Sequence, residues 1–87
     1  MADMIHCQLL SPEGAVFDGQ VTFVGAHALD GRVGILPNHA PLITALGEGS
    51  LVLKTESDGE RKWTVRGGFM EVLDNHVSIL AEGLQES

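Results

Sequence analysis

Four histidines and one cysteine have the widest chemical repertoire of any residues in this sequence, and their spacing argues against catalysis. The histidines are His6, His27, His39 and His76. No two of them stand at the HxH, HxxxH or HExxH spacing by which one segment holds a metal ion, so we interpret them as scattered surface or turn residues. Cys7 is the only cysteine. It excludes an internal disulfide, and its apolar neighbours predict a buried thiol.

Sequence motifs of catalytic and nucleotide-binding sites are missing as well. No serine stands in a GxSxG nucleophile elbow, no glycine-rich loop ends in Lys-Ser or Lys-Thr, and no GxGxxG fingerprint occurs. We therefore predict a protein that is not an enzyme and that has no catalytic, cofactor-binding or metal-binding residues. A small metal-dependent enzyme, in which several histidines converge in space, remains an alternative at this point.

Length, composition and charge limit the class of protein. The 87 residues predict one domain, spanning 1–87, and the 44% of hydrophobic residues can supply its core. The formal net charge of −7 predicts repulsion of nucleic acid and of anionic lipid, but attraction to a protein partner with a basic patch. No apolar run approaches the ~20 residues needed to span a bilayer, and the first residues lack the pattern of a signal peptide. We expect a cytoplasmic protein that is monomeric in isolation.

Short alternating runs predict an all-β fold. Apolar and polar residues alternate in segments 5–9, 51–56, 62–66 and 77–82, and pairs of turn-forming residues such as Asp30-Gly31 and Asp74-Asn75 separate the runs. No segment of ten or more residues has helical spacing. The pair Gly67-Gly68 is interpreted as a bend or bulge between strands. Strands at such short intervals are typical of a sandwich or barrel.

The most informative segment is residues 31–46, with the sequence GRVGILPNHAPLITAL. Pro37 and Pro41 fix φ at two positions and disfavour helix in the residues before them. We expect a rigid, extended loop between two apolar runs, with His39 at its centre. Such a loop suits a recognition surface, and a corner that only turns the chain is the alternative.

This segment resembles the epsilon subunit of rotary, F-type ATP synthases, whose pattern G-x-x-G-I-L-P-x-H-A-P-L-I-T-x-L begins here at Gly31. The resemblance continues at residues 16–19, 67–72 and 76–81, so it runs from about residue 5 to residue 81. It implies a flattened β-sandwich of ten strands in two sheets. In this family a C-terminal pair of helices follows, which can inhibit ATP hydrolysis and in some members binds ATP. The helices are absent from this sequence, either as a natural short form or because the chain is trimmed.

The resemblance also implies a function and a set of contacts. The function is that of a non-catalytic rotor subunit of a proton-translocating ATP synthase, at the cytoplasmic face of the bacterial inner membrane. It would join the gamma subunit of the central stalk to the membrane ring of c subunits and so couple ion flow to ATP synthesis. The implied gamma contacts are Ser11, His39 and Thr44, and the implied ring contacts are Asp30, Gly31 and Arg32. An unrelated β-sandwich adaptor or ligand-binding module is the alternative.

Some members of this family have an acidic residue at the position of Arg32. The charge pairing with the ring is therefore left open.

Overall fold

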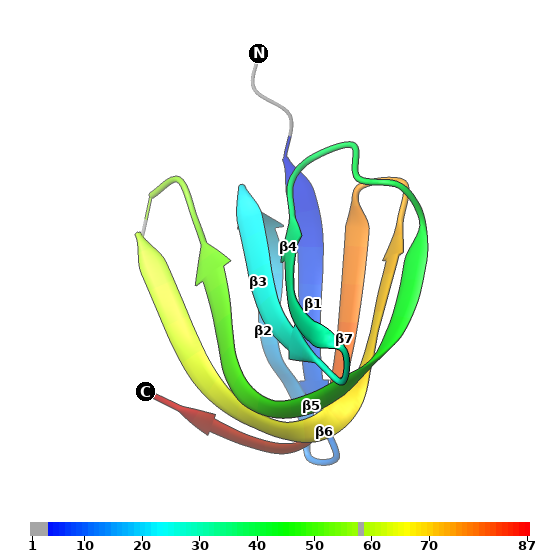
Figure 1. Ribbon diagram of the computed structural model, residues 1–87. Coiled ribbons are helices and arrows are strands. Elements are labelled where there is room, and N and C mark those ends of the chain that lie inside the picture. Colours follow the sequence, from blue (N-terminus) through cyan, green and yellow to red (C-terminus); the bar gives the residue numbers. More distant parts are fainter. Residues whose placement is uncertain (1–3, 58) are drawn as a thin grey trace.

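The computed structural model describes residues 4–57 and 59–87, and these residues form β-strands, turns and loops without any helix (Figure 1). The strands are β1 (Ile5–Ser11), β2 (Gly14–Val21), β3 (Phe23–Ala28), β4 (Gly31–Ile35), β5 (Leu42–Lys54), β6 (Glu60–Leu73) and β7 (His76–Glu86). Within the described part of the chain, no helix is long and apolar enough to cross a membrane.

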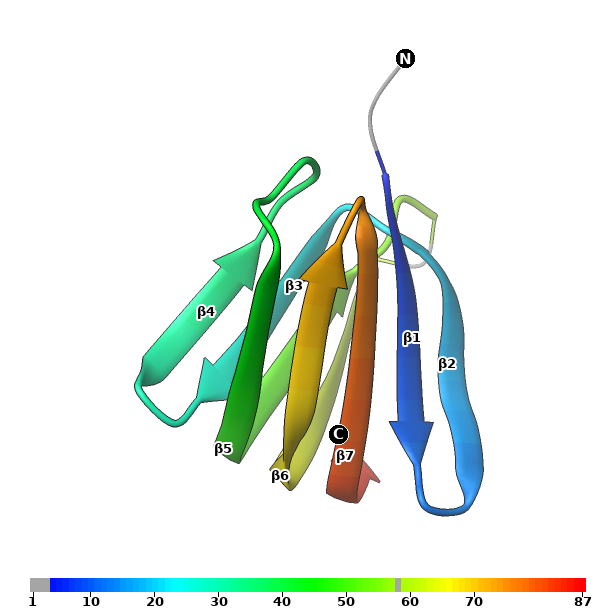
Figure 2. The same cartoon turned by 90° about the vertical axis from the view of Figure 1, so that its right-hand side faces the viewer.

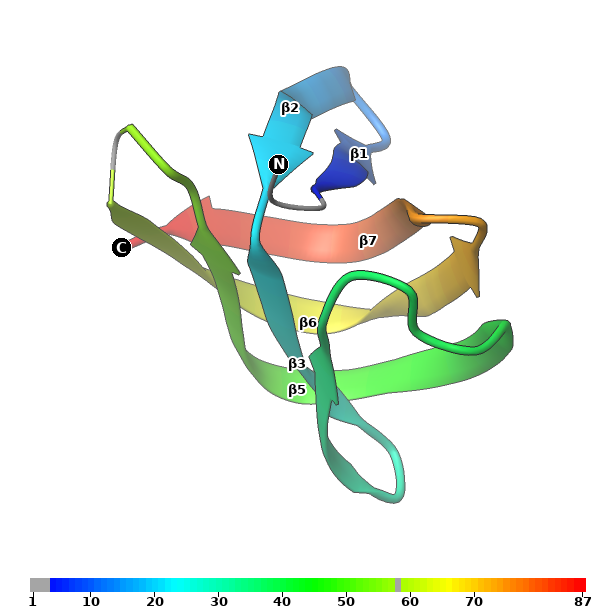
Figure 3. The same ribbon diagram turned by 90° about the horizontal axis from the view of Figure 1, so that it is seen from above.

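All seven strands belong to one hydrogen-bonded sheet, in the order β2-β1-β7-β6-β5-β3-β4. Neighbouring strands are antiparallel, except that β1 and β7 run parallel. The long strands β5, β6 and β7 are strongly curved, so the sheet folds over on itself into two layers (Figures 1 and 3). The β-sandwich thus arises from a single sheet.

Glycines lie where the long strands bend. In β6, Gly67 and Gly68 have φ angles of 79° and 135°, a region that side chains with a Cβ rarely adopt. A Cβ on Gly68 would also collide with the main chain of Leu80 in β7. Curvature and close approach of the neighbouring strand therefore both require glycine at this position.

The alternation of buried side chains changes phase at the bend. Before it, β6 buries Trp63 and Val65; after it, β6 buries Met70 and Val72. One strand therefore presents apolar side chains to the interior in both layers, and the positive φ angles of Gly67 and Gly68 accompany the change of phase between them.

The predicted all-β sandwich is confirmed, whereas the expected ten strands in two sheets differ from the seven strands in one sheet that the structure describes. The physical reason is the continuity of hydrogen bonding through the bends of β5, β6 and β7. Counting the two segments of each long strand separately turns seven strands into ten.

The core lies between the two layers. Its largest fully buried side chains come from all parts of the sheet: Trp63, Ile5, Leu9, Ile35, Leu51, Leu53, Met70 and Ile79. The buried set contains no polar or charged residue among those described. Cys7 is buried as expected, and burial, with the nearby charge of Asp18, raises the pKa of its thiol to about 12.

Candidate functional site

The loop at residues 36–41, here called the proline loop, connects β4 to β5. The main-chain N–H of His39 donates to the carbonyl oxygen of Leu36 at 3.2 Å, which closes a tight turn. Pro37 occupies the second position of this turn and Asn38, with φ of 68°, the third. Proline followed by a residue of positive φ is the pattern of a type II turn. The expected non-strand segment is therefore present, and its conformation follows from its sequence.

A pair of asparagines attaches the proline loop to the turn between β6 and β7. The main-chain N–H of Asn38 donates to Oδ1 of Asn75 at 2.6 Å, and Nδ2 of Asn75 donates to Oδ1 of Asn38 at 3.0 Å. The carbonyl oxygen of Asn75 also accepts from the N–H of His6 at 2.9 Å. Side-chain and main-chain bonds together fix the loop against the sheet.

His39 is half-buried in the proline loop, and its Nδ1 donates to the carbonyl oxygen of Ala40 at 2.7 Å. The other polar atom of the ring, Nε2, is then the acceptor of the neutral side chain. Thr44 lies two residues into β5, opposite buried Met70, and its Oγ1 donates to the carbonyl oxygen of Ala45 at 3.3 Å. Its side chain is therefore on the inner face of the sheet.

Ser11 lies far from the other two predicted gamma contacts. It ends β1 at the lower end of the molecule in Figures 1 and 2, whereas the proline loop with His39 is at the upper end. Its hydroxyl donates to the carbonyl oxygen of Gly14 and accepts from the N–H of Glu13, each at 3.2 Å, so it stabilises the β1–β2 turn. The structure does not bring the three residues together in one compact site.

The three predicted ring contacts, by contrast, lie together at the β3–β4 hairpin, at the same end as the β1–β2 turn (Figure 2). Asp30 is exposed at the tip, and Gly31 has a φ of 131° that suits glycine. Nη1 of Arg32 lies 3.3 Å from Nδ1 of His27 and donates to Oγ of Ser50, also at 3.3 Å. Arg32 is thus held against the sheet, while Asp30 extends into solvent.

An apolar band on the outer face of the sheet was not predicted. It consists of Leu10, Leu80, Phe69 and Ile43. Leu10, Leu80 and Phe69 stand side by side on β1, β7 and β6, and Ile43 lies on the neighbouring strand β5. Leu80, Phe69 and Ile43 are 52%, 59% and 73% exposed. The signal in the sequence was an apolar residue at positions where strict alternation calls for a polar one.

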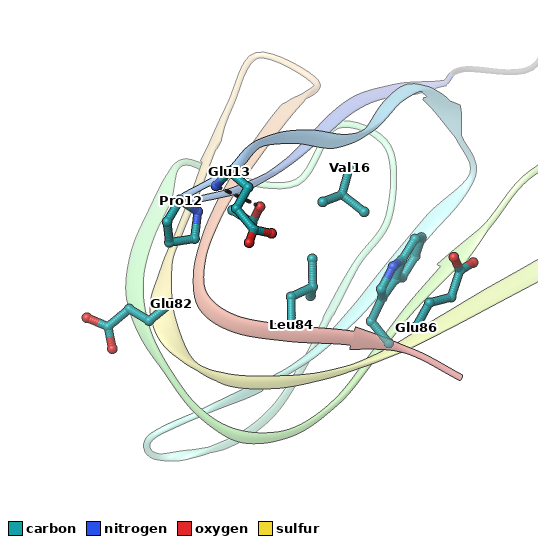
Figure 4. Close-up of a pocket in the computed structure, with 8 residues that line it drawn as sticks. Pro12, Glu13, Val16, Glu82, Leu84 and Glu86 are labelled. Atoms are coloured by element: carbon teal, nitrogen blue, oxygen red, sulfur yellow. Dashed lines mark hydrogen bonds between the residues drawn. The ribbon is translucent and has the colours of Figure 1, made fainter.

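A pocket of about 360 Å³ lies between the β1–β2 hairpin and the end of β7 (Figure 4). We call it the acidic pocket. It is lined by Ser11, Pro12, Glu13, Val16, Trp63, Glu82, Leu84 and Glu86. Glu86 accepts from Arg61 at 2.8 and 3.1 Å, and the guanidinium of Arg61 lies 4.9 Å from the ring centre of Trp63.

Two of the four histidines do meet in space. The rings of His6 and His76 stack with their centres 5.1 Å apart, and Nε2 of His6 lies 2.6 Å from Oδ1 of Asp18. Hydrogen bonds from Gln8 and from His6 lower the pKa of Asp18. Among residues 4–57 and 59–87, no three His, Cys, Asp or Glu side chains are grouped so that they could hold a metal ion.

Comparison with known sequences identifies relatives over nearly the whole chain. The family model described as "ATP synthase, Delta/Epsilon chain, beta-sandwich domain" matches residues 4–87. The ATP synthase epsilon chain of Brevibacillus brevis is 48% identical over 75 residues, which cover 86% of this chain and 57% of that protein. The ATP synthase epsilon chain of Nitratidesulfovibrio vulgaris is 41% identical over 88 residues, covering 100% of this chain and 64% of that protein. The chain thus spans about three fifths of the length of these relatives.

Comparison with solved structures supports the fold. A chain of the mitochondrial ATP synthase of Euglena gracilis superposes with a TM-score of 0.90 at 20% identity, over 99% of this chain and 55% of that chain. A chain of the mitochondrial ATP synthase of Tetrahymena thermophila gives a TM-score of 0.75 at 20% identity, over 92% and 64% of the two chains. Both agree with the folded-over sheet described above. The match of the family model from residue 4 to residue 87 sets aside an unrelated β-sandwich, and the chain belongs to the family of ATP synthase delta/epsilon chain β-sandwich domains.

Proposed function

We propose that this domain is a non-catalytic part of the rotor of a proton-translocating ATP synthase, at the cytoplasmic face of a bacterial membrane. It binds the gamma subunit of the central stalk through the outer face of its sheet and faces the ring of c subunits with its β3–β4 hairpin. The observation that carries the proposal is the apolar band. Supporting it are two bacterial relatives named ATP synthase epsilon chain and two structural neighbours from assemblies titled with a c-ring.

The apolar band has the character of a protein interface. Three large hydrophobic side chains stand next to one another on a rigid sheet and are half or more exposed. A contiguous apolar patch of this kind is unfavourable in water and usually marks a surface that a partner covers. An aromatic side chain such as Phe69 is the type of residue on which interface energy concentrates.

The band also connects the proposed gamma contacts. Leu10 precedes Ser11 and Ile43 precedes Thr44, so the band reaches from the β1–β2 turn to the start of β5, near the proline loop with His39. A long partner lying along the outer face would meet all three regions. Because the side chain of Thr44 faces inward, we propose that gamma contacts the side chain of Ile43 at this position. Thr44 then acts only indirectly, through its neighbour Ile43.

The proline loop adds rigidity to this surface. Two prolines and the Asn38–Asn75 hydrogen bonds restrict the loop before any partner binds. A loop that is ordered in advance loses less conformational entropy on association and transmits force with less slip. His39 then offers a half-buried ring and one acceptor nitrogen to gamma.

The end of the domain opposite the proline loop is suited to contact with the ring of c subunits. Asp30 and Leu29 are exposed at the hairpin tip, whereas Arg32 is held by His27 and Ser50. We propose that Asp30, Gly31 and Arg32 meet the polar loops of the c subunits. Contacts of this exposed kind contribute little free energy each and weaken with salt.

Binding of purified gamma subunit to this domain tests the proposal, with Phe69→Ser as the decisive variant. Loss of a central aromatic should weaken binding by at least tenfold, equivalent to about 1.4 kcal/mol. The control is Leu29→Ser, which removes an apolar side chain from the hairpin tip that is 72% exposed, against 59% for Phe69. Wild-type affinity in Leu29→Ser and weakened affinity in Phe69→Ser are expected. Failure of the wild-type domain to bind gamma, or equal affinities of all three proteins, would overturn the proposal.

A further inference from the structure

The last part of β7 has no neighbouring strand on one of its two sides. β1 pairs with residues 76–80 of β7, and beyond them only β6 pairs with β7 within residues 4–57 and 59–87. We call residues 82–86 the free edge of β7. A strand edge of this kind exposes a row of main-chain donors and acceptors to which a further strand can bond.

The direction of the main-chain groups on the free edge follows from one hydrogen bond. The N–H of Ser87 donates to the carbonyl oxygen of Lys62 in β6 at 2.9 Å. In an antiparallel pair, residues that bond to the neighbouring strand alternate with residues whose main-chain groups point away from it. Because Ser87 is directed at β6, the N–H and C=O groups of Leu84 and Glu86 point to the open side. These groups can therefore bond to an added strand.

The space beside the free edge is open on both faces of the sheet. The acidic pocket lies on this side of β7, between Leu84 and the β1–β2 hairpin with Val16 (Figure 4). A second hollow of about 270 Å³ borders the same edge on the outer face, and it is lined by Thr64, Arg66, Leu84 and Gln85. Neighbouring strands of a sheet lie only about 4.8 Å apart. The two hollows therefore flank the place that a further strand would occupy.

Arg66 supplies a second, independent observation. A Cβ on Gly83 would lie 3.0 Å from Nε and 3.4 Å from Nη2 of Arg66, so the arginine side chain crosses β7 where a side chain is missing. Its guanidinium thus lies next to the free edge and away from Glu48, the residue opposite Arg66 on β5. In the part of the chain that the structure describes, no carboxylate forms an ion pair with Arg66. The forked donors of a guanidinium match a carboxylate.

We propose that the free edge of β7 binds an extended, acidic segment of a protein partner by strand addition. Main-chain hydrogen bonds to Leu84 and Glu86 hold the segment, as in other cases where a peptide extends a sheet. A carboxylate that stands opposite Gly83 accepts from the guanidinium of Arg66. Residues on the other face of the segment enter the acidic pocket, where Val16 and Leu84 favour an apolar side chain.

Charge favours a different protein over a second copy of this chain. Two copies joined edge to edge would bring Glu82 and Glu86 of both chains together, and each chain has a formal net charge of −7. Like charges on adjacent strands are destabilising, and charged residues on an edge protect against self-pairing. This site goes beyond the proposed function. The experiments use the domain alone, so their outcome does not depend on binding of gamma.

The probe is the capped peptide acetyl-Thr-Val-Glu-Val-Thr-amide, which has a glutamate on one face of a strand and two valines on the other. We expect saturable downfield shifts and slower hydrogen exchange of the Leu84 and Glu86 amide protons, with a Kd of roughly 1–10 mM. The amides of Gly83 and Gln85, which point to β6, should change little. No saturable shift, or shifts without this alternation, would overturn the proposal. Shifts of the same amides with protein concentration alone would identify a second copy as the occupant and would also overturn it.

The preference for a carboxylate is tested with the glutamine analogue of the peptide and with Arg66→Gln. The analogue should bind the wild type about threefold more weakly, because one exposed ion pair is lost. Arg66→Gln should bind both peptides equally well. The control, Lys54→Gln, makes the same change in net charge on β5, away from the free edge, and should keep the preference of the wild type. Equal binding of both peptides by the wild type, or the same loss in both variants, would contradict an acidic segment.

The main-chain bonds are tested by Glu86→Pro against Glu86→Gln. Proline removes the N–H that points to the open side and leaves the bonds to β6, which belong to Gln85 and Ser87. We expect at least tenfold weaker binding of the peptide. Glu86→Gln loses the same carboxylate, with its bonds to Arg61, but keeps the N–H, so it should bind at least as well as the wild type. With core amide shifts unchanged in both variants, equal binding by the two would show that no strand is added here.

Discussion

Asn38 and Asn75 are hydrogen-bonded to each other although they lie 37 positions apart in the chain. Each adopts a positive φ, 68° and 62°, so each presents its side chain from a turn that few residue types form readily. One donates its main-chain N–H to the other's Oδ1, and the second donates its Nδ2 in return. This reciprocal pair makes the proline loop and the β6–β7 turn one unit.

Replacement of Asn75 by glycine should loosen the proline loop without unfolding the domain. Glycine accepts the positive φ at this position, so the variant removes the side-chain hydrogen bonds alone. We expect a loss of about 1 kcal/mol in the free energy of unfolding and faster hydrogen exchange of the Asn38 amide. Exchange of core amides in β1 should be unchanged after correction for stability. Unaltered protection of Asn38 would show that the loop is ordered by its prolines alone.

Trp63→Ala should nearly abolish folding. The side chain is 1% exposed and is the largest in the core, so its removal leaves a cavity that costs about 3–5 kcal/mol. A domain of this size has a total stability of only about 5–10 kcal/mol. Urea unfolding measures the loss in the free energy of unfolding. Trp63→Phe fills most of the volume that Trp63→Ala leaves empty, so it should recover more than half of that free energy. A midpoint equal to that of the wild type would contradict the burial of the indole.

Gly68→Ala should be much more destabilising than Gly14→Ala, although the two glycines have similar φ angles of 135° and 127°. A Cβ on Gly14 would enter open space, whereas one on Gly68 would strike the main chain of Leu80. We expect Gly14→Ala to lower the free energy of unfolding by about 1–2 kcal/mol, because of backbone strain, and Gly68→Ala to lower it by at least about 3 kcal/mol. Thermal unfolding of the two variants gives the comparison. Equal losses would mean that the bend in β6 does not depend on close strand approach.

The sequence predicted the alternation within each layer better than the joining of the layers. The alternation in segment 62–66 assigns its two apolar residues, Trp63 and Val65, to one face, and both are buried. The bend at Gly67-Gly68 was expected between two strands. In the structure β6 continues through it, because hydrogen bonds to β5 and β7 persist on both sides of the glycines. Local alternation shows which face of a strand is apolar. It carries no information on whether the hydrogen bonds to the neighbouring strands continue through a bend.

The candidate site was predictable only in its local parts. The tight turn of the proline loop follows from Pro37 and Asn38, whose conformational preferences act within four residues. The pairing of Asn38 with Asn75 depends on the relative position of two loops, which no short-range pattern specifies. The apolar band was missed because Leu80 stands in the polar phase of β7, and only the strand order shows that Phe69 and Leu10 lie beside it.

Acid should destabilise the domain in part through Asp18. Its hydrogen bonds from Gln8 and His6 lower its pKa in the folded state relative to the unfolded chain. The resulting stabilisation is present above the pKa of the unfolded state and is lost as the pH falls through the lower pKa of the folded state. We expect the melting temperature of the wild type to fall below about pH 4 more steeply than that of Asp18→Asn. Asp30→Asn, at the exposed hairpin tip, serves as the control. Parallel pH profiles for wild type and Asp18→Asn would show that the carboxylate does not contribute.

His39→Asp should weaken binding of gamma while leaving the fold intact. His39 lies in the loop outside the core, and within the described part of the chain its Nδ1 bonds only to the adjacent Ala40 carbonyl. The substitution therefore leaves Pro37, Pro41 and the Asn38–Asn75 bonds in place. A carboxylate at this position replaces a half-buried ring and its acceptor nitrogen by a charge that must be desolvated at the interface. We expect at least tenfold weaker binding of gamma, with a melting temperature within about 2 °C of the wild type. His76→Asp, at the start of β7, is the matched control for an added carboxylate. If His39→Asp binds gamma normally, or if it unfolds the domain, the proline loop is a structural corner and the proposed contact at His39 is wrong.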